Sequence, residues 1–216
     1  MRLDHVSYAA SHDQLVDVVQ RLGSQIGSAF TDGGIHPRFG TRNFTLALKN
    51  GHYLEVVCPL DHPAADVTPF GKVVSQRANE GGGWLTWVLS TEDISIIENR
   101  LSRVAVDGHR KLPDGIDLRW KQIGVLDTLR DPQLPFFVQW LSSEHPSSKE
   151  KATATAEIVS LEISGIESKI CEWVGSSLES ALNGIQVKWI NPSDNNGETG
   201  LIAISLKTSF GIIRLD

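Results

Sequence analysis

The sequence predicts an α+β fold built from βαβββ modules, because one pattern recurs three times along its 216 residues. In each copy a short apolar strand leads into a turn that begins with Ser or Thr, an amphipathic helix follows, and strand-like segments come after it. The three opening strands are expected at residues 3–8, 84–89 and 158–163. A repeated unit of this kind cannot bury its own apolar face, so the units are expected to pair.

In the first module the sequence marks both the helix and the hairpin that follow the opening strand. Ser11 is the expected N-cap, Gln14 is its capping-box partner, and Gly23 is the expected end of the helix. Asn50 and Gly51 form a dipeptide that is typical of a two-residue hairpin turn. The expected elements after the opening strand are a helix at 11–22, a loop at 31–34, a strand at 44–48 and a closing strand at 53–58.

The second and third modules follow the same order, with different connections before them. The glycines at 81–83 favour a flexible joint, and the Ser-, Lys- and Glu-rich stretch 142–155 favours an exposed linker. Around the second module the expected elements are helices at 69–77 and 90–104, a turn at 113–115, and strands at 118–124 and 136–141. In the third module they are a helix at 166–178 and strands at 186–190, 201–206 and 212–215.

Composition indicates an acidic, globular protein. Hydrophobic residues make up 40% of the chain and charged residues 21%, which suffices for a buried core. The net charge is -6 and no Lys/Arg run is present, so neither nucleic acid nor a membrane is an expected partner. No apolar run approaches the roughly 20 residues of a membrane span. With no leader-like start and only two cysteines, the expected location is the reducing cytoplasm.

Short motifs follow one another in a definite order over residues 1–146. Leu3-Asp4-His5-Val6 precedes the first helix, and Tyr53-Leu54-Glu55-Val56 closes the first module. The other landmarks are His36-Pro37, Gly40-Thr41-Arg42-Asn43, Pro113-Asp114-Gly115, Leu134-Pro135-Phe136-Phe137 with Trp140, and His145-Pro146. In this order and spacing the chain resembles the glyoxalase-like domain family of the vicinal oxygen chelate (glyoxalase, bleomycin resistance, extradiol dioxygenase) superfamily.

The resemblance implies an architecture and a division of the chain. Two βαβββ modules over residues 1–146 would form an incomplete barrel around a site, followed by a linker at 147–156 and a third, partial βαβββ-like module at 157–216. The third module would have an apolar sheet face to bury, either on the core or on a second chain. A homodimer is therefore one expectation.

The resemblance also implies a divalent metal ion that is chelated by neighbouring oxygens of the substrate. Its first-module ligands would be His5 and Glu55, and Glu55 is also the candidate catalytic base. The second module departs from the family pattern, because Thr86 and Gln139 stand at its two ligand positions.

The chemistry of these side chains suits Zn, Ni, Mn or Fe(II). Two protein ligands are too few for a metal centre, so His36 is the candidate third ligand, with His145 or Gln139 as alternatives. The residues also allow a structural interpretation, in which His5 is a hydrogen-bonded wall residue and Glu55 meets Arg42 or Arg214.

A second set of residues is expected to contact the substrate. Gly40 would allow close backbone approach, and Arg42 offers a planar fork for a carboxylate or phosphate. The alternative is an ordinary turn that Asn43 caps. If Trp120 lines the cavity, the ligand is partly apolar or aromatic. The candidate substrate-binding residues are Thr41, Arg42, Asn43, Trp120 and Gln139.

These expectations describe a metal-assisted lyase, isomerase or dioxygenase that acts on a small, oxygen-rich metabolite in the barrel cavity. The competing expectation is a metal-free small-molecule-binding protein of the resistance or sequestration type, which Thr86 and Gln139 favour. The sequence contains no Ser-His-Asp hydrolase elbow, phosphate-binding glycine loop or CxxC pair that would indicate another class.

Overall fold

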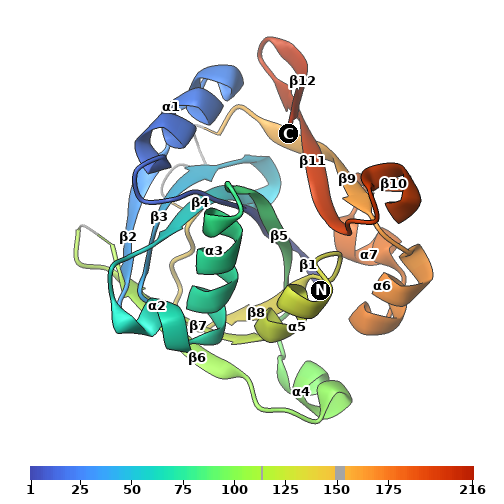
Figure 1. Ribbon diagram of the computed structural model, residues 1–216, viewed down its shortest axis with the longest axis horizontal. Coiled ribbons are helices and arrows are strands. Elements are labelled where there is room, and N and C mark those ends of the chain that lie inside the picture. Colours follow the sequence, from blue (N-terminus) through green and yellow to red (C-terminus); the bar gives the residue numbers. More distant parts are fainter. Residues whose placement is uncertain (113, 149–153) are drawn as a thin grey trace.

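The computed structural model describes residues 1–112, 114–148 and 154–216, and their strands form two sheets. Eight strands in the order β2-β3-β4-β1-β5-β8-β7-β6 form a mixed sheet that curls almost into a barrel (Figure 1). Four strands in the order β10-β9-β11-β12 form a second sheet beside it. The expected α+β fold, with paired βαβββ modules and a third such module, is confirmed.

Two βαβββ modules form the barrel and join through their opening strands. The first contains β1 (Arg2–Ala9), α1 (Leu15–Ile26), β2 (Thr31–His36), β3 (Thr41–Ala47) and β4 (Tyr53–Pro59). The second contains β5 (Gly83–Ser90), α4 (Ser95–Leu101), β6 (Val106–Lys111), β7 (Asp117–Ile123) and β8 (Phe136–Trp140). β1 and β5 pair antiparallel, and each also pairs in parallel with the closing strand of its own module. The outer strands β2 and β6 meet where the barrel nearly closes.

Three helices in the described part of the barrel lie outside the βαβββ pattern, two between the modules and one between β7 and β8. They are α2 (Pro63–Val67), α3 (Pro69–Asn79) and α5 (Val125–Arg130). Thr68 caps α3 by accepting a backbone N–H of the first turn, and Pro69 follows in the first helical position. α3 buries Phe70 and Val73 in an apolar cluster that also contains Val138 of β8. The helix therefore forms part of the wall around the barrel interior.

The third module packs its sheet on the outside of the barrel. It contains β9 (Glu157–Ser164), α6 (Glu167–Val174), α7 (Leu178–Leu182), β10 (Gln186–Ile190), the 3-10 turn η2 (Pro192–Asn195), β11 (Gly200–Thr208) and β12 (Gly211–Leu215). Leu161 and Ile204 of this sheet share one buried cluster with Trp87 of β5. The indole of Trp84 also donates to the carbonyl oxygen of Leu215 at 3.2 Å. The apolar face of the sheet is thus buried against the core of the same chain.

The barrel edge differs from the sequence expectation. Residues 31–34, expected as a loop, belong to strand β2, and residues 106–111 form strand β6, where no element was expected. A Cβ added at Gly33 would lie 2.8 Å from Nη1 of Arg110, and Gly34 has a φ of 88°. The two glycines therefore let β2 pass close to β6, which a larger residue would prevent.

Three helices differ from their expected bounds. α1 runs beyond its expected end to Ile26, and Gly27, with a φ of 76°, occupies the left-handed position after it. Ser11 begins a turn before α1, where its hydroxyl accepts the N–H of Gln14, and does not cap the helix. Only part of the expected helix at 90–104 forms, as α4. The helix expected at 166–178 is interrupted at Gly175, which has a φ of 76°, and continues as α7.

The hairpin between β3 and β4 is confirmed. It contains the 3-10 turn η1 (Lys49–Gly51), in which Asn50 and Gly51 have φ values of 63° and 77°. Both residues are left-handed, as a two-residue hairpin turn requires. Pro113 of the expected turn at 113–115 and residues 149–153 of the expected linker lie outside the described residues.

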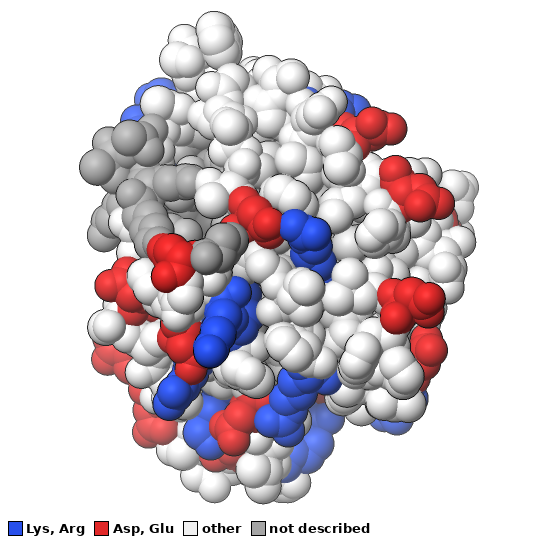
Figure 2. Space-filling view, turned by 90° about the vertical axis from the view of Figure 1, so that its left-hand side faces the viewer, with Lys and Arg blue, Asp and Glu red and all other residues white. Residues whose placement is uncertain are grey.

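The surface carries charges of both signs. On the described part of the face in Figure 2, acidic and basic side chains are interspersed rather than gathered by sign. Within the described residues, no helix is long and apolar enough to cross a membrane.

Candidate functional site

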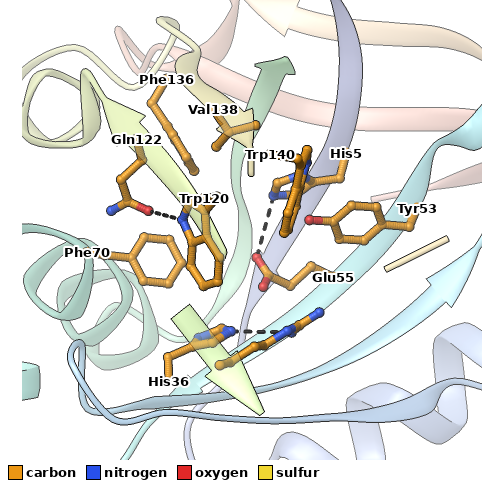
Figure 3. Close-up of a pocket in the computed structure, with 11 residues that line it drawn as sticks. His5, His36, Tyr53, Glu55, Phe70, Trp120, Gln122, Phe136, Val138 and Trp140 are labelled. Carbon is orange, nitrogen blue, oxygen red and sulfur yellow. Dashed lines mark hydrogen bonds and ion pairs between the residues drawn. The ribbon is translucent and has the colours of Figure 1, made fainter. Parts of the chain in front are cut away.

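A small cavity of about 30 Å³ lies inside the barrel, between the two modules. Its polar lining comes mainly from the first module and its apolar lining mainly from the second module and α3. Figure 3 shows His5 and Glu55 pointing toward one another, with Trp120 and Phe70 across the cavity. The lining residues are His5, His36, Tyr53, Glu55, Phe70, Arg110, Trp120, Gln122, Phe136, Val138 and Trp140.

His5 lies on β1 and is held by its chain neighbour Asp4. Its Nδ1 is 2.7 Å from Oδ1 of Asp4, and its ring stacks on Tyr53 with centroids 4.3 Å apart. The β1–β5 register shifts between Leu3 and His5, an irregularity of the kind that re-aims a side chain. Because Nδ1 of His5 is hydrogen-bonded to Asp4, the other ring nitrogen, Nε2, faces the cavity and lies 3.9 Å from Oε2 of Glu55.

Asp4 is a fully buried carboxylate that also fixes the mouth of the cavity. Its Oδ2 accepts hydrogen bonds from the indole of Trp140 and from Nε2 of His145, each at 3.1 Å. Burial alone would raise the pKa of Asp4, but the hydrogen bonds from His145 and His5 outweigh burial and hold this pKa well below its usual range. Asp4 is therefore ionised, and His5 donates its Nδ1 proton to it.

Glu55, on β4, has both carboxylate oxygens occupied. Oε2 accepts from the hydroxyl of Ser7 and Oε1 from the side-chain amide of Asn43, each at 2.6 Å. Burial works to raise the pKa of Glu55, but nearby His5 and His36 and the two hydrogen bonds lower it overall. The side chain is a buried, ionised acceptor whose orientation is set by the first module.

Arg110 reaches the cavity from β6, across the seam of the barrel. Its Nη1 donates to the side-chain oxygen of Asn43 and lies 3.3 Å from Nε2 of His36. His36 in turn contacts the hydroxyl of Thr41 through Nδ1 at 2.9 Å. Burial, followed by the positive charge of Arg110, lowers the pKa of His36 to about 3, so this imidazole is neutral. It therefore donates to Thr41 and accepts from Arg110.

The structure brings most of the predicted site residues together. His5, His36, Glu55 and Trp120 line the cavity. Thr41 and Asn43 lie directly behind the cavity wall, where they hold other residues by hydrogen bonds.

Arg42 and Gln139 do not reach the cavity. The guanidinium of Arg42 donates to Asp32 at 2.6 Å, and the amide of Gln139 bonds to the backbone of Glu92 and Ile94. Both differences follow from strand alternation. On β8 Val138 rather than Gln139 faces inward, and on β3 the cavity side carries Thr41 and Asn43, the two neighbours of Arg42.

Three further residues belong to the site although the sequence did not predict them: Asp4, Arg110 and Tyr53. Asp4 stands beside His5 in the first motif, so adjacency was a usable signal. Arg110 had a weaker signal, since it shares one strand face with Gly108, the buried residue that pairs with Trp120. The segment has too few apolar residues to predict strand β6 from sequence, and without the strand the shared face is not apparent.

The donor set does not fit a metal centre with three protein ligands. His5 and Glu55 face each other, but both oxygens of Glu55 are hydrogen-bonded and Nε2 of His36 faces Arg110. The second module contributes Arg110, Gln122, Val138 and aromatic rings to the cavity. Arg110 is a cation, and the amide oxygen of Gln122 already accepts the indole N–H of Trp120 at 2.8 Å, so neither offers a free ligand atom. Among the described residues, no group of three or more His, Cys, Asp or Glu side chains could hold a metal ion.

Comparisons with known proteins agree with this architecture. A glyoxalase-like domain matches residues 3–171, whereas no curated protein sequence matches the chain. The crystal structure of a hypothetical protein from Staphylococcus aureus is similar with a TM-score of 0.72 and 17% identity, over 100% of this chain and 98% of that one. That likeness includes the third module and shows the fold alone.

Two methylmalonyl-CoA epimerases are less similar. The enzyme from Mycobacterium tuberculosis gives a TM-score of 0.43 at 16% identity, over 64% of this chain and 86% of that one. A single-residue variant of the enzyme from Streptomyces coelicolor, in complex with 2-nitronate-propionyl-CoA, gives a TM-score of 0.44 at 16% identity, over 67% of this chain and 99% of that one.

Proposed function

Since the chain belongs to the glyoxalase-like domain family, we propose that its barrel binds a small, oxygen-rich organic molecule and that His5 exchanges a proton with this ligand. The observation that carries the proposal is the pair formed by Asp4 and His5, with Nε2 of His5 facing the cavity. The proposed chemistry is that of a lyase or isomerase that works by acid–base catalysis, without a protein-bound metal.

The Asp4–His5 pair has the arrangement that a general base requires. An ionised carboxylate holds the Nδ1 proton and leaves the Nε2 lone pair directed at the reacting atom. If Nε2 takes a proton from a carbon next to a carbonyl, the imidazolium that forms lies between Asp4 and Glu55. Both carboxylates stabilise that positive charge, and the same proton or a solvent proton returns to the carbon.

The walls of the cavity set the kind of ligand. Phe70, Trp120 and Phe136 offer apolar and aromatic surface opposite the polar side. The volume of about 30 Å³ admits only a small group, so a larger ligand requires rotation of a wall side chain. Trp140 is the partly exposed side chain of the lining, and its rotation would open the cavity at the cost of the hydrogen bond that its indole donates to Asp4.

The test is a ligand screen followed by proton exchange. Small carbonyl compounds are screened by the change in tryptophan fluorescence, and each compound that binds is incubated in D₂O and followed by proton NMR. We expect wild-type protein to exchange the acidic C–H of the ligand, and His5→Gln to bind it but to exchange it about a hundredfold more slowly.

His12→Gln is the matched control, because the side chain of His12 is 71% exposed and does not line the cavity. Exchange at an unchanged rate in His5→Gln would refute the role of His5. Binding without exchange in wild-type protein would instead identify a metal-free sequestering protein.

The metal-assisted lyase, isomerase or dioxygenase is the second candidate, and one observation favours it. His5 Nε2 and Glu55 Oε2 are 3.9 Å apart with no hydrogen bond between them, as two side chains directed at a common partner would be. These residues would be the ligands for Zn, Ni, Mn or Fe(II), with His36 as the third only after it leaves Arg110.

Elemental analysis of protein purified without an affinity tag separates the two candidates. About one equivalent of a transition metal that is lost in His5→Ala would support the metal-assisted candidate. A metal content that stays near zero after reconstitution would leave the acid–base proposal in place.

A further inference from the structure

Arg110 is a buried cation whose direct partners are neutral. Its side chain is among the largest that are fully buried, and the residue is 2% exposed. Nη1 contacts the amide oxygen of Asn43 and the neutral ring of His36, and Nε has no hydrogen-bond partner. Among the described residues, no carboxylate forms an ion pair with it. A buried charge without an ion-pair partner lowers the stability of the fold, unless a bound ligand supplies the opposite charge and the missing hydrogen bonds.

Glu55 and Asp32 attract the charge of Arg110 from a distance, but the hydrogen bonds that link Glu55 to Arg110 run through Asn43. The amide nitrogen of Asn43 donates to Glu55, and its oxygen accepts from Arg110. The carboxylate of Glu55 is therefore turned toward Ser7 and Asn43, and the Nε–H of the guanidinium has no protein acceptor.

The backbone is adapted to hold Arg110 at this place. β2 passes the guanidinium at Gly33, where an added Cβ would lie 2.8 Å from Nη1 and would also collide with the side chain of Asn43. The glycine at this point in the strand leaves room for the side chains of Arg110 and Asn43. The guanidinium thus belongs to a built pocket rather than to a mobile surface side chain.

We infer that Arg110 receives the carboxylate of the ligand, so that the cavity is a site for a small organic acid. A planar guanidinium pairs with a carboxylate through two parallel hydrogen bonds, and one of them would use the Nε–H that has no protein partner. The apolar part of the acid then lies against Trp120 and Phe70, and His5 lines the same cavity. This inference rests on the proposed function and specifies its ligand class.

Acetate and acetamide are the probes, because they have the same size and differ in charge. Protein with ¹⁵N-labelled arginine is titrated with each, and the Nε–H signals are followed by NMR after through-bond assignment. We expect acetate to shift the Arg110 signal until the site is saturated. Acetamide should bind at least about tenfold more weakly than acetate. Arg42 is the internal control, since it pairs with Asp32 away from the cavity and its signal should not move.

Arg110→Lys is the matched variant, because it keeps the charge but not the planar fork, and it should weaken acetate binding. If that variant does not fold, the wild-type titration alone decides. Equal shifts with acetate and acetamide, or an Arg110 signal that acetate leaves in place, would overturn the organic-acid inference. If neutral carbonyl compounds still quench the tryptophans in that case, the proposed function stands without it; if nothing binds, both fail.

Discussion

His36 is neutral in the folded protein because burial, and then the positive charge of Arg110, lower its pKa to about 3 from an ordinary value of 6.5. The unfolded chain takes up a proton on this side chain near pH 6.5, whereas the folded chain does so only near pH 3. Between these values the unfolded state binds more protons, so acid destabilises the fold. His52, whose pKa burial lowers to about 4, acts in the same direction.

We therefore expect the free energy of unfolding to fall by about 2 kcal/mol between about pH 6.5 and about pH 5 because of His36 alone. His36→Gln should remove this part of the decrease and leave the part due to His52. Urea unfolding at several pH values measures it, with His12→Gln as the exposed control. A pH slope that is the same in His36→Gln and wild type would show that His36 titrates normally in the folded protein.

Strands β2 and β6 decide which side chains the seam of the barrel presents. β6 brings Arg110 to Asn43 of β3 and His36 of β2, although 67 and 74 residues separate these positions in the chain. The approach depends on Gly33, which leaves room for the guanidinium. An element without apolar periodicity of its own thus completes the polar side of the cavity.

Gly33→Ala should lower the free energy of unfolding by about 1–3 kcal/mol, because the new methyl group overpacks the contact between Asn43 and Arg110. The same variant should weaken the response of Arg110 to acetate without a change in any charged group. Urea unfolding and the NMR titration measure the two effects. Ile35→Ala, on the same strand but 47% exposed, should stay within about 0.5 kcal/mol of wild type; similar losses in both variants would contradict the packing argument.

Across the molecule, the barrel and the second sheet share one apolar cluster. Ile204 of β11 is completely buried in this cluster together with Trp87 of β5. The sheet face from which a homodimer was expected is therefore occupied by the chain's own core. The homodimer itself stays a prediction, which sedimentation at several concentrations tests.

Because the cluster is shared, the two sheets should unfold together. We expect Ile204→Ala to lower the free energy of unfolding by about 2–5 kcal/mol and to shift a single transition of fluorescence and circular dichroism. Ile212→Ala is the control, since that side chain is 71% exposed on the neighbouring strand. Two separate transitions, with only one shifted by Ile204→Ala, would mean that the third module unfolds independently.

Much of the architecture was predictable because its signals are local. The opening strands of the three modules, the hairpin at Asn50 and Gly51, and the helix that begins at Pro69 all follow from short-range periodicity, capping and turn residues. The boundaries of the other helices were less predictable, because burial of Ile26 and left-handed glycines such as Gly175 set where they end.

From the amino-acid order alone it follows that the chain forms three βαβββ modules and, through the family resemblance, that His5 and Glu55 belong to one site. What surrounds these two residues depends on the folded chain. The inward face of β8 differs by one position from the expected face, which exchanges Gln139 for Val138 because alternate residues of a strand point to opposite sides. Arg110 joins the site only because the eight-stranded sheet curls until β6 meets β2, and the curvature of a sheet depends on contacts between distant strands that no local pattern encodes.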